Sequence, residues 1–165
     1  MTLNNTPNTG TSLQPMPLER FAAYMQHSVT AYAQENVAAK RWLVGGALER
    51  AQADFQALLP LGLATPNHYL FEVVRQIDDC VVGWLWFAVE ERVGQRDAYV
   101  YDLEIKPVHQ RQGHAKLAFQ HMEALVREMG LQRIGLHVFA HNAGAQKLYE
   151  RLGYSTTGMN MAKLI

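Results

Sequence analysis

Apolar positions follow two different periods along the chain, and the first part has the period of helices. Apolar side chains recur at three- and four-residue intervals over residues 17–36. The same spacing runs over residues 44–59, where Pro60 and Gly62 follow and stop a helix. The pattern therefore predicts two amphipathic helices, preceded by a short strand near Thr11–Gln14.

From residue 68 onward the apolar positions take the period of strands. Strands are expected at His68–Gln76, Val81–Val89, Ala98–Ile105, Arg133–Phe139 and Tyr154–Met161, and helices at Ala115–Met129 and Gly144–Leu152. This order predicts an α/β (α+β) fold, in which a mixed, mostly antiparallel sheet is flanked by helices. The strand-helix-strand unit near residues 98–139 should be parallel.

Composition and charge narrow the classes of function. The 165 residues include 15 Lys+Arg and 15 Asp+Glu, so the formal net charge is +0. The chain therefore lacks the excess of positive charge that binding of nucleic acid requires. The longest apolar run, Cys80 to Val89, is far shorter than the roughly 18 residues that cross a membrane. The beginning of the sequence lacks the features of a signal peptide and Cys80 is the lone cysteine, so we expect a cytoplasmic protein without an intrachain disulfide. Residues 1–10 are expected to form a flexible arm and residues 11–165 a single domain.

One segment has the pattern of an anion-binding loop. Residues 103–116 lead from a strand through a short loop into a helix, and Gly113 and Ala115 are small. Unpaired backbone N–H groups at a helix N-terminus can hold a pyrophosphate, provided that small residues let it approach the main chain. Taken alone, the pattern also fits a turn that merely needs glycine.

A second segment gives the loop a more specific meaning. Residues 142–154 fit the pattern N-x-x-A-x-x-L-Y-x-x-x-G-[FY], through Asn142, Ala145, Leu148, Tyr149, Gly153 and Tyr154. The earlier loop fits Q/R-x-x-G-x-G/A, through Gln110, Gly113 and Ala115. With two motifs in this order, each at a strand-to-helix junction, the chain resembles the GCN5-related N-acetyltransferase (GNAT) family over roughly residues 11–165.

The resemblance implies a fold and a co-substrate. It implies that the strands at Ala98–Ile105 and Arg133–Phe139 splay apart and that the pantetheine arm of acetyl-CoA enters the gap. The main chain of residues 103–105 would lie along that arm, the backbone of residues 111–116 would hold the pyrophosphate, and Asn142 would bond the arm from the other side. The implied cofactor-binding residues are Leu103, Glu104, Ile105, Gln110, Arg111, Gln112, Gly113, His114, Ala115, Lys116, Asn142 and Tyr149.

The chemistry of acetyl transfer selects three candidate catalytic residues. An alkylammonium with a pKa of about 10 must lose a proton before its nitrogen can attack a thioester. Asp102 and Glu104 are the nearest carboxylates on the expected strand, on the face with Val100 and opposite Tyr99, Tyr101, Leu103 and Ile105. Either carboxylate could instead be satisfied by a neighbouring Tyr or Lys. A main-chain N–H near Ile105 could bind the oxyanion.

Tyr149 is the candidate acid. It stands where the family usually keeps a tyrosine beside the sulfur of CoA, and its hydroxyl can protonate the leaving thiolate. The alternative is that its ring only packs against the cofactor or the core.

Other polar and aromatic residues have ordinary structural interpretations. His137 and His141 span a strand end and a loop, so no metal site is expected. We expect solvated positions for His109, His114 and His121, and for Glu35, Glu49 and Asp54 on the first two helices. Trp84 and Trp86 share a strand face, where they could line an acceptor pocket or belong to the core.

The sequence thus predicts an acetyl-CoA-dependent N-acetyltransferase acting on a primary amine in a ternary complex. The acceptor would be a small-molecule amine or a peptide, with no nucleic acid, membrane or metal involved. A non-catalytic acyl-CoA-binding sensor or interaction module of the same fold is the alternative. A homodimer paired through free strand edges stays open.

Overall fold

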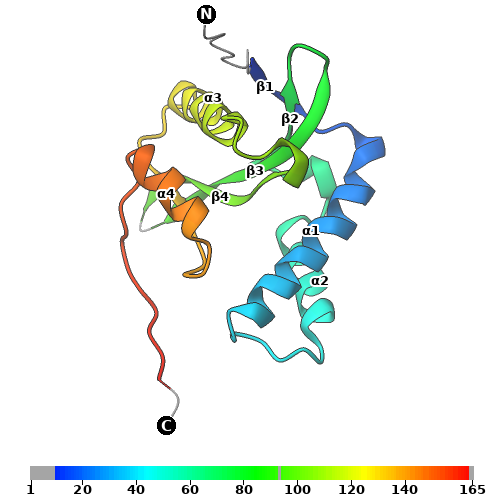
Figure 1. Ribbon diagram of the computed structural model, residues 1–165, viewed down its shortest axis with the longest axis vertical. Helices are drawn as coiled ribbons and strands as arrows, with labels where there is room; N and C mark the ends of the chain where they lie inside the picture. The colour runs from blue at the N-terminus through cyan, green and yellow to red at the C-terminus, as the bar shows by residue number, and fades with distance from the viewer. Residues whose placement is uncertain (1–9, 93, 164–165) are drawn as a thin grey trace, which may run out of the picture.

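The computed structural model describes residues 10–92 and 94–163 and contains one five-stranded sheet (Figure 1). Its strands, in spatial as well as chain order, are β1 (Thr11–Pro15), β2 (His68–Arg75), β3 (Cys80–Arg92), β4 (Gln95–Ile105) and β5 (Ile134–Leu136). The pairs from β1 to β4 are antiparallel, and β4 and β5 are parallel. The predicted mixed, mostly antiparallel sheet is confirmed. The arm expected over residues 1–10 lies, apart from Gly10, outside the described residues.

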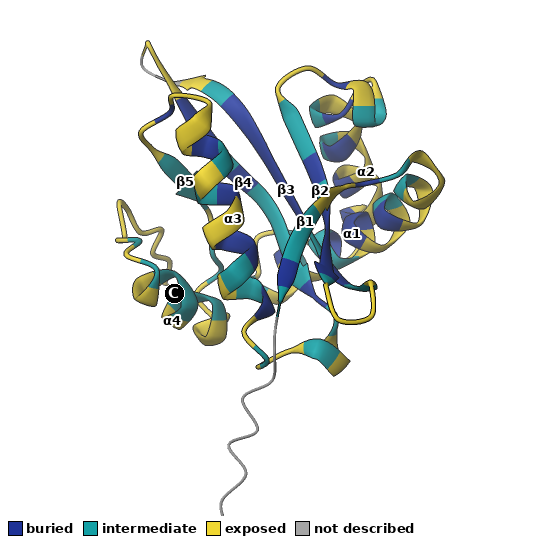
Figure 2. Cartoon of the chain, turned by 90° about the horizontal axis from the view of Figure 1, so that it is seen from above, coloured by how far each residue is buried: buried dark blue, intermediate teal, exposed yellow. Residues whose placement is uncertain are grey.

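Two pairs of helices cover the two faces of the sheet (Figure 2). The helices are α1 (Leu18–Ala38), α2 (Ala47–Leu58), α3 (His114–Glu128) and α4 (Ala143–Arg151), with short 3-10 turns η1 (Gly62–Ala64) and η2 (Pro107–His109). One apolar core joins the sheet to α3 and α4, and a second, centred on Trp86 and Phe55, joins it to α1 and α2. The predicted helices are confirmed, although Leu18, at the first turn of α1, is 75% exposed.

The parallel strands separate where the resemblance to the GNAT family implied a splay. Hydrogen-bonded pairing of β4 with β5 covers residues 98–100, which face Ile134–Leu136. From Asp102 to Ile105, β4 pairs with β3 alone. The edge of β4 that faces α4 is therefore left unpaired by the sheet over these residues.

A bulge in β4 corrects the predicted alternation of its side chains. Trp86 faces Asp102 and the next residue of β3, Phe87, faces Val100, so Tyr101 is an extra residue in β4. Because of it, Tyr101 stacks on Trp86 on the side of α1 and α2, the side on which the Asp102 carboxylate is bonded. The prediction that Tyr101 shares a face with Leu103 and Ile105, opposite Asp102, is wrong.

The strand predicted at Tyr154–Met161 is absent from the structure. Residues 154–163 form no regular element and run away from the domain in Figure 1, with Met159 81% and Met161 91% exposed. Strand β5, expected over Arg133–Phe139, is only three residues long. A strand forms only where a neighbouring strand satisfies its backbone hydrogen bonds. Because β5 is so short, it offers few backbone groups with which residues 154–161 could pair.

Gly83 allows β3 to approach β4 closely at the splay. A Cβ atom at this position would overlap the carbonyl oxygen of Glu104 and lie 3.0 Å from the Cα atom of Ile105. Gly83→Ala is therefore expected to reduce the free energy of unfolding by about 1–3 kcal/mol, because backbone must move to admit the methyl group. Thermal melts measure the loss, and Gly144→Ala, where the nearest atom lies 3.9 Å away, is the control. Equal melting temperatures for wild type and Gly83→Ala would contradict this account.

Candidate active site

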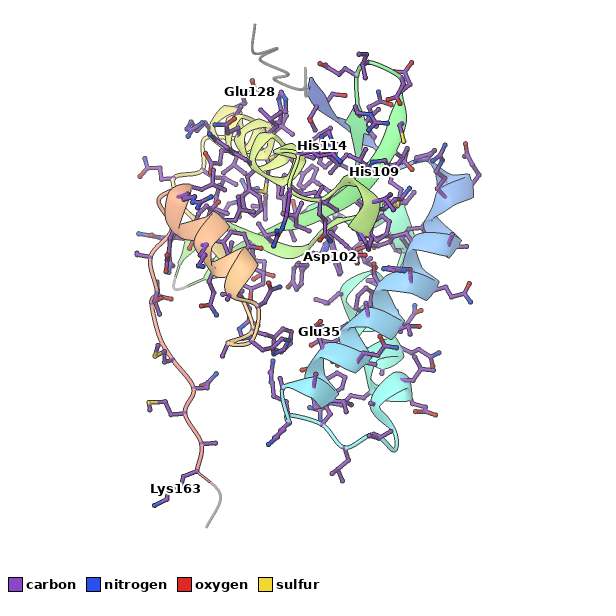
Figure 3. The ribbon with its side chains drawn as sticks, viewed as in Figure 1. Glu35, Asp102, His109, His114, Glu128 and Lys163 are labelled. Atoms are coloured by element: carbon purple, nitrogen blue, oxygen red, sulfur yellow. The ribbon has the colours of Figure 1, made fainter. Side chains whose placement is uncertain are left out.

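A cavity of about 790 Å³ opens where β4 and β5 separate. Its walls come from α1, α2, β4, α4 and the segment after β5, with single residues from the loop after α1, β3, β5, the loop before α3 and the C-terminal segment. Of the predicted site residues, those that line it are Asp102, Leu103, Glu104, Ile105, Gln110, Asn142 and Tyr149. Residues 111–116 do not line it but continue from Gln110 at its edge. Figure 3 shows Asp102 near the centre of the fold, between the sheet and α1.

Asp102 is held by two hydroxyl groups of α1. The hydroxyls of Tyr24 and Ser28 each donate a hydrogen bond of 3.1 Å to its Oδ2 atom. Burial raises the pKa of the Asp102 carboxyl to about 6, although the bonds from Ser28 and Tyr24 act in the opposite direction. The carboxylate is therefore ionised at neutral pH but close enough to its pKa to accept a proton.

Sequence reasoning missed both partners of Asp102. Tyr24 and Ser28 stand four residues apart and are buried on the same face of α1. Polar hydroxyls at helical spacing beside an apolar stripe were the available signal, because a buried hydroxyl needs a hydrogen-bond partner.

Glu104 has a different environment from Asp102. The Nε2 atom of His27 lies 3.0 Å and 2.9 Å from its two carboxylate oxygens, and both side chains are partly exposed. The ring of His27 also packs edge-on against Trp84, with 5.0 Å between centroids. Glu104 is thus a paired carboxylate at the cavity wall. No local pattern indicates that His27 reaches it, since 77 residues separate them.

Both tryptophans of β3 belong to the core, and one of them also reaches the cavity. Trp84 and Trp86 pack in the core beneath α1 and α2, and Trp86 is 1% exposed. Trp86 also lines the cavity. Its indole N–H donates to Nδ1 of His68 at 3.1 Å, so its polar group is satisfied inside the core.

Tyr149 reaches the cavity from α4. Its ring packs against Phe119 and Tyr154, at centroid distances of 5.3 Å and 5.9 Å. Burial, with a further contribution from the charge of Asp102, raises the pKa of Tyr149 to about 12. The hydroxyl therefore keeps its proton at neutral pH and can donate it.

Asn142 begins α4 and faces the cavity. Its Oδ1 atom accepts a hydrogen bond of 3.1 Å from the backbone N–H of Ala145, so it caps the helix. The cap occupies the oxygen of the side-chain amide, and the Nδ2 group remains as the donor that a ligand could use.

The predicted anion-binding loop has the backbone geometry of a cradle. Gln110 braces it through Nε2, which donates to the carbonyl oxygen of Ile105 at 2.9 Å. Arg111, with φ of 59°, and Gly113, with φ of 88°, then turn the chain into α3. Gly113 is the N-cap, so the N–H groups of the first turn of α3 have no intrahelical acceptor.

His114 corrects the expectation of a solvated side chain. It is 1% exposed, and its Nδ1 atom lies 2.8 Å from the hydroxyl of Thr11 on β1. Burial lowers the pKa of His114, which keeps the ring neutral at physiological pH. The imidazole is buried because α3 packs across β1, and the exposed His121, two helical turns further along, also bonds the carbonyl oxygen of Thr11 at 2.7 Å. His114 can thus contribute its backbone N–H to the loop while its side chain fixes the helix to the sheet.

Two acidic residues expected to be solvated also line the cavity, and Glu35 is exposed as expected while Asp54 is partly buried. Glu35 on α1 and Asp54 on α2 belong to its wall. The Oε2 atom of Glu35 lies 2.6 Å from Nε2 of His141, in the loop before α4. Helix position alone could not reveal this, because the cavity forms only when α1 and α2 meet the loop after β5.

Within residues 10–92 and 94–163, no three or more His, Cys, Asp or Glu side chains are grouped so as to hold a metal ion. No helix in these ranges is long and apolar enough to cross a membrane.

Comparison with known proteins assigns the family. The family model described as the acetyltransferase (GNAT) family matches residues 25–154, so the chain belongs to this family. It is similar to two Bacillus subtilis (strain 168) proteins. One is the uncharacterized N-acetyltransferase YycN, 38% identical over 92% of this chain and 96% of that protein. The other is the uncharacterized N-acetyltransferase YdgE, which is 32% identical over 92% of this chain and 96% of that protein. The crystal structure of YycN superposes with a TM-score of 0.88 at 37% identity, covering 94% of this chain and 98% of that one.

Proposed function

We propose that this protein transfers an acetyl group from acetyl-CoA to a primary amine, with both substrates bound at once. The observation that carries the proposal is the position of Asp102. This half-buried carboxylate, with a pKa of about 6, lines the same cavity as the protonated hydroxyl of Tyr149. A base and an acid therefore face one cavity at the splay, as a proton-coupled acyl transfer requires.

The residues at the splay fit acetyl-CoA. The unpaired edge of β4 over Leu103–Ile105 can pair with the amides of the pantetheine arm as an added strand would. The first turn of α3, behind Gly113, offers backbone N–H groups to the pyrophosphate. Asn142 can bond the arm from the α4 side. When bound, acetyl-CoA supplies the activated thioester.

Two side chains would move the protons. Asp102 accepts the proton that the acceptor nitrogen must lose, and its pKa of about 6 leaves it ionised for that step at neutral pH. The amine nitrogen bonds to the acetyl carbon as the carbon–sulfur bond breaks. Tyr149 donates its proton to the departing sulfur, and a backbone N–H near Ile105 stabilises the charge on the acetyl oxygen. Glu104, paired with His27, stays the alternative base.

The test of this function is release of free CoA that depends on an added amine. We expect thiol release from acetyl-CoA over a panel of small amines and lysine-containing peptides. If acetyl-CoA raises the melting temperature but no acceptor releases CoA, the protein is a non-catalytic acyl-CoA-binding module and the proposal is wrong.

The proposed pyrophosphate site gives a prediction at Gly113. Gly113→Val should abolish the stabilisation by acetyl-CoA, which is about 2.7 kcal/mol at roughly 100 times its dissociation constant, because the side chain blocks the helix N–H groups. Since Gly113 has φ of 88°, valine also strains the backbone and lowers the melting temperature without ligand.

Gly130, at the other end of α3, provides the matched control. Its φ of 76° imposes similar strain on a substituted residue, and no atom lies within 4 Å of a Cβ built there. Gly130→Val should lose stability but keep the full melting-temperature shift with acetyl-CoA. Equal melting-temperature shifts with acetyl-CoA in both variants would mean that the pyrophosphate does not bind at Gly113.

A further inference from the structure

The cavity continues beyond the reacting groups along α1. Asp102 and Glu104 belong to its wall on β4, and Glu35 and Asp54 add two carboxylates from α1 and α2. Figure 3 shows Asp102 near the sheet and Glu35 further along α1, toward the loop that precedes α4. Asp102 and Glu35 thus mark two ends of an acidic wall.

Cationic side chains only partly balance these carboxylates. Among the lining residues that the structure describes, Arg41 is the sole Arg or Lys, and its guanidinium lies over the ring of Phe139 at 5.8 Å. Of the histidines at and beside the cavity, His27 is bonded to Glu104 and His141 to Glu35, while burial lowers the pKa of His137 and keeps it neutral. The cavity therefore has an excess of negative charge, which favours a cationic acceptor.

Helix α1 sets the spacing between the two acidic ends. Ser28, which bonds Asp102, and Glu35 are seven residues apart, or two helical turns. They lie on the same face of α1, about 10 Å apart along its axis. A ligand that reaches both ends must therefore carry positive charges about 10 Å apart.

Aromatic rings form the wall between the ends. Tyr32 packs on Phe55, Phe55 on Trp86 and Trp86 on Tyr101, with centroid distances of 5.8, 5.5 and 4.7 Å. All four residues line the cavity. Such a wall favours methylene groups, and its ring faces also attract ammonium groups.

We propose that the acceptor is a linear diamine or polyamine, whose reacting nitrogen lies at Asp102 and whose second ammonium binds Glu35 in place of His141, with Asp54 on α2 adding negative charge to the same cavity. This inference rests on the proposed function and specifies its substrate class. Glu35 and Asp54 are then specificity-determining residues, which attract the far end of the acceptor and take no part in proton transfer.

A matched pair of acceptors isolates the second charge. Heptylamine and α,ω-diaminoheptane have the same chain length, and only the diamine has an ammonium for the outer end. Steady-state CoA release should give the diamine a KM about tenfold below that of heptylamine, with similar kcat. Spermidine, with a comparable span, should behave like the diamine.

Variants that replace a carboxylate with an uncharged amide show which residues cause the difference in KM between the two acceptors. Glu35→Gln and Asp54→Asn should each raise the KM for the diamine by severalfold, toward that for heptylamine, and leave the values for heptylamine unchanged. Glu49→Gln, an exposed position on α2 outside the cavity, is the control and should change neither acceptor.

The outcomes distinguish failure of the proposed acetyltransferase function from failure of the polyamine assignment. If no amine releases CoA, the proposed function fails and this inference fails with it. If amines react but heptylamine and the diamine have equal KM values, or Glu35→Gln affects both alike, the acetyltransferase stands and the polyamine assignment is wrong. Preferential reaction of lysine peptides over every diamine would also overturn the assignment.

Discussion

Asp102→Asn is expected to lower kcat by about 10²- to 10⁴-fold, because it removes the group that accepts the proton of the acceptor. With saturating acceptor, wild-type kcat should rise with pH through about 6, the pKa of Asp102, and then level off. In Asp102→Asn this rise, the acidic limb of the pH–rate profile, should be absent. Asparagine keeps an oxygen that can accept the bonds of Tyr24 and Ser28, so the fold is retained.

The stability of the same variant should change in the opposite direction. In the folded protein the pKa of Asp102 is about 6, above its ordinary 3.8. A raised carboxyl pKa contributes stability that is complete below the unfolded pKa and is lost as pH rises through the folded one. The uncharged asparagine avoids that loss, so at about pH 8 the free energy of unfolding of the variant should exceed that of wild type by up to about 3 kcal/mol. Thermal melts measure the difference, and the two proteins should melt alike at about pH 4.

Glu104→Gln is the comparison that decides between the two carboxylates. The negative charge of Glu104 contributes to the raised pKa of Asp102, so the pH dependence of kcat should respond to a change at either residue. We expect the Glu104 variant to keep the acidic limb, with the apparent pKa somewhat lower because a neighbouring negative charge has been removed. Loss of the limb in Glu104→Gln alone would make Glu104 the base. An unchanged limb in both variants would leave proton removal to water or to the acceptor itself.

Local patterns predicted the elements of this fold because each depends on nearby residues. The helical period before residue 60, the strand period after residue 68 and the two strand-to-helix junctions are all local features. The resemblance to the GNAT family, carried by the two motifs, placed Asn142 and Tyr149 at the gap between the parallel strands and Asp102 on one of those strands, and all three line one cavity.

The errors arose where distant segments decide the outcome. A bulge at Tyr101 shifts the faces of β4, and strict alternation does not foresee an inserted residue. His114 is buried because β1, about a hundred residues earlier, lies beneath α3. The sequence did not indicate that Glu35 and Asp54 line a cavity, because that cavity exists only when α1 and α2 face the loop after β5. The strand predicted at residues 154–161 fits its own pattern but has no ladder partner in the structure.

Tyr149→Phe tests the other half of the proposed chemistry. Phenylalanine keeps the ring contacts with Phe119 and Tyr154 and loses only the hydroxyl. Because burial holds the pKa of Tyr149 at about 12, the hydroxyl of the wild type is a full donor at every pH of interest. We expect kcat to fall by about one to three orders of magnitude, while the affinity for acetyl-CoA stays within a few-fold.

The competing role for Tyr149, packing alone, predicts a different pattern across two variants. Tyr149→Phe would then keep its kcat, and Tyr149→Ala would lose stability and activity together, since the aromatic cluster of α3 and α4 would lose a ring. Tyr154→Phe is the matched control, because Tyr154 packs in the same cluster but does not line the cavity. Measurements of kcat, acetyl-CoA affinity and melting temperature for the three variants separate the roles. A Tyr149→Phe protein with wild-type kcat, under conditions where the chemical step limits the rate, would end the proposal that Tyr149 is the acid.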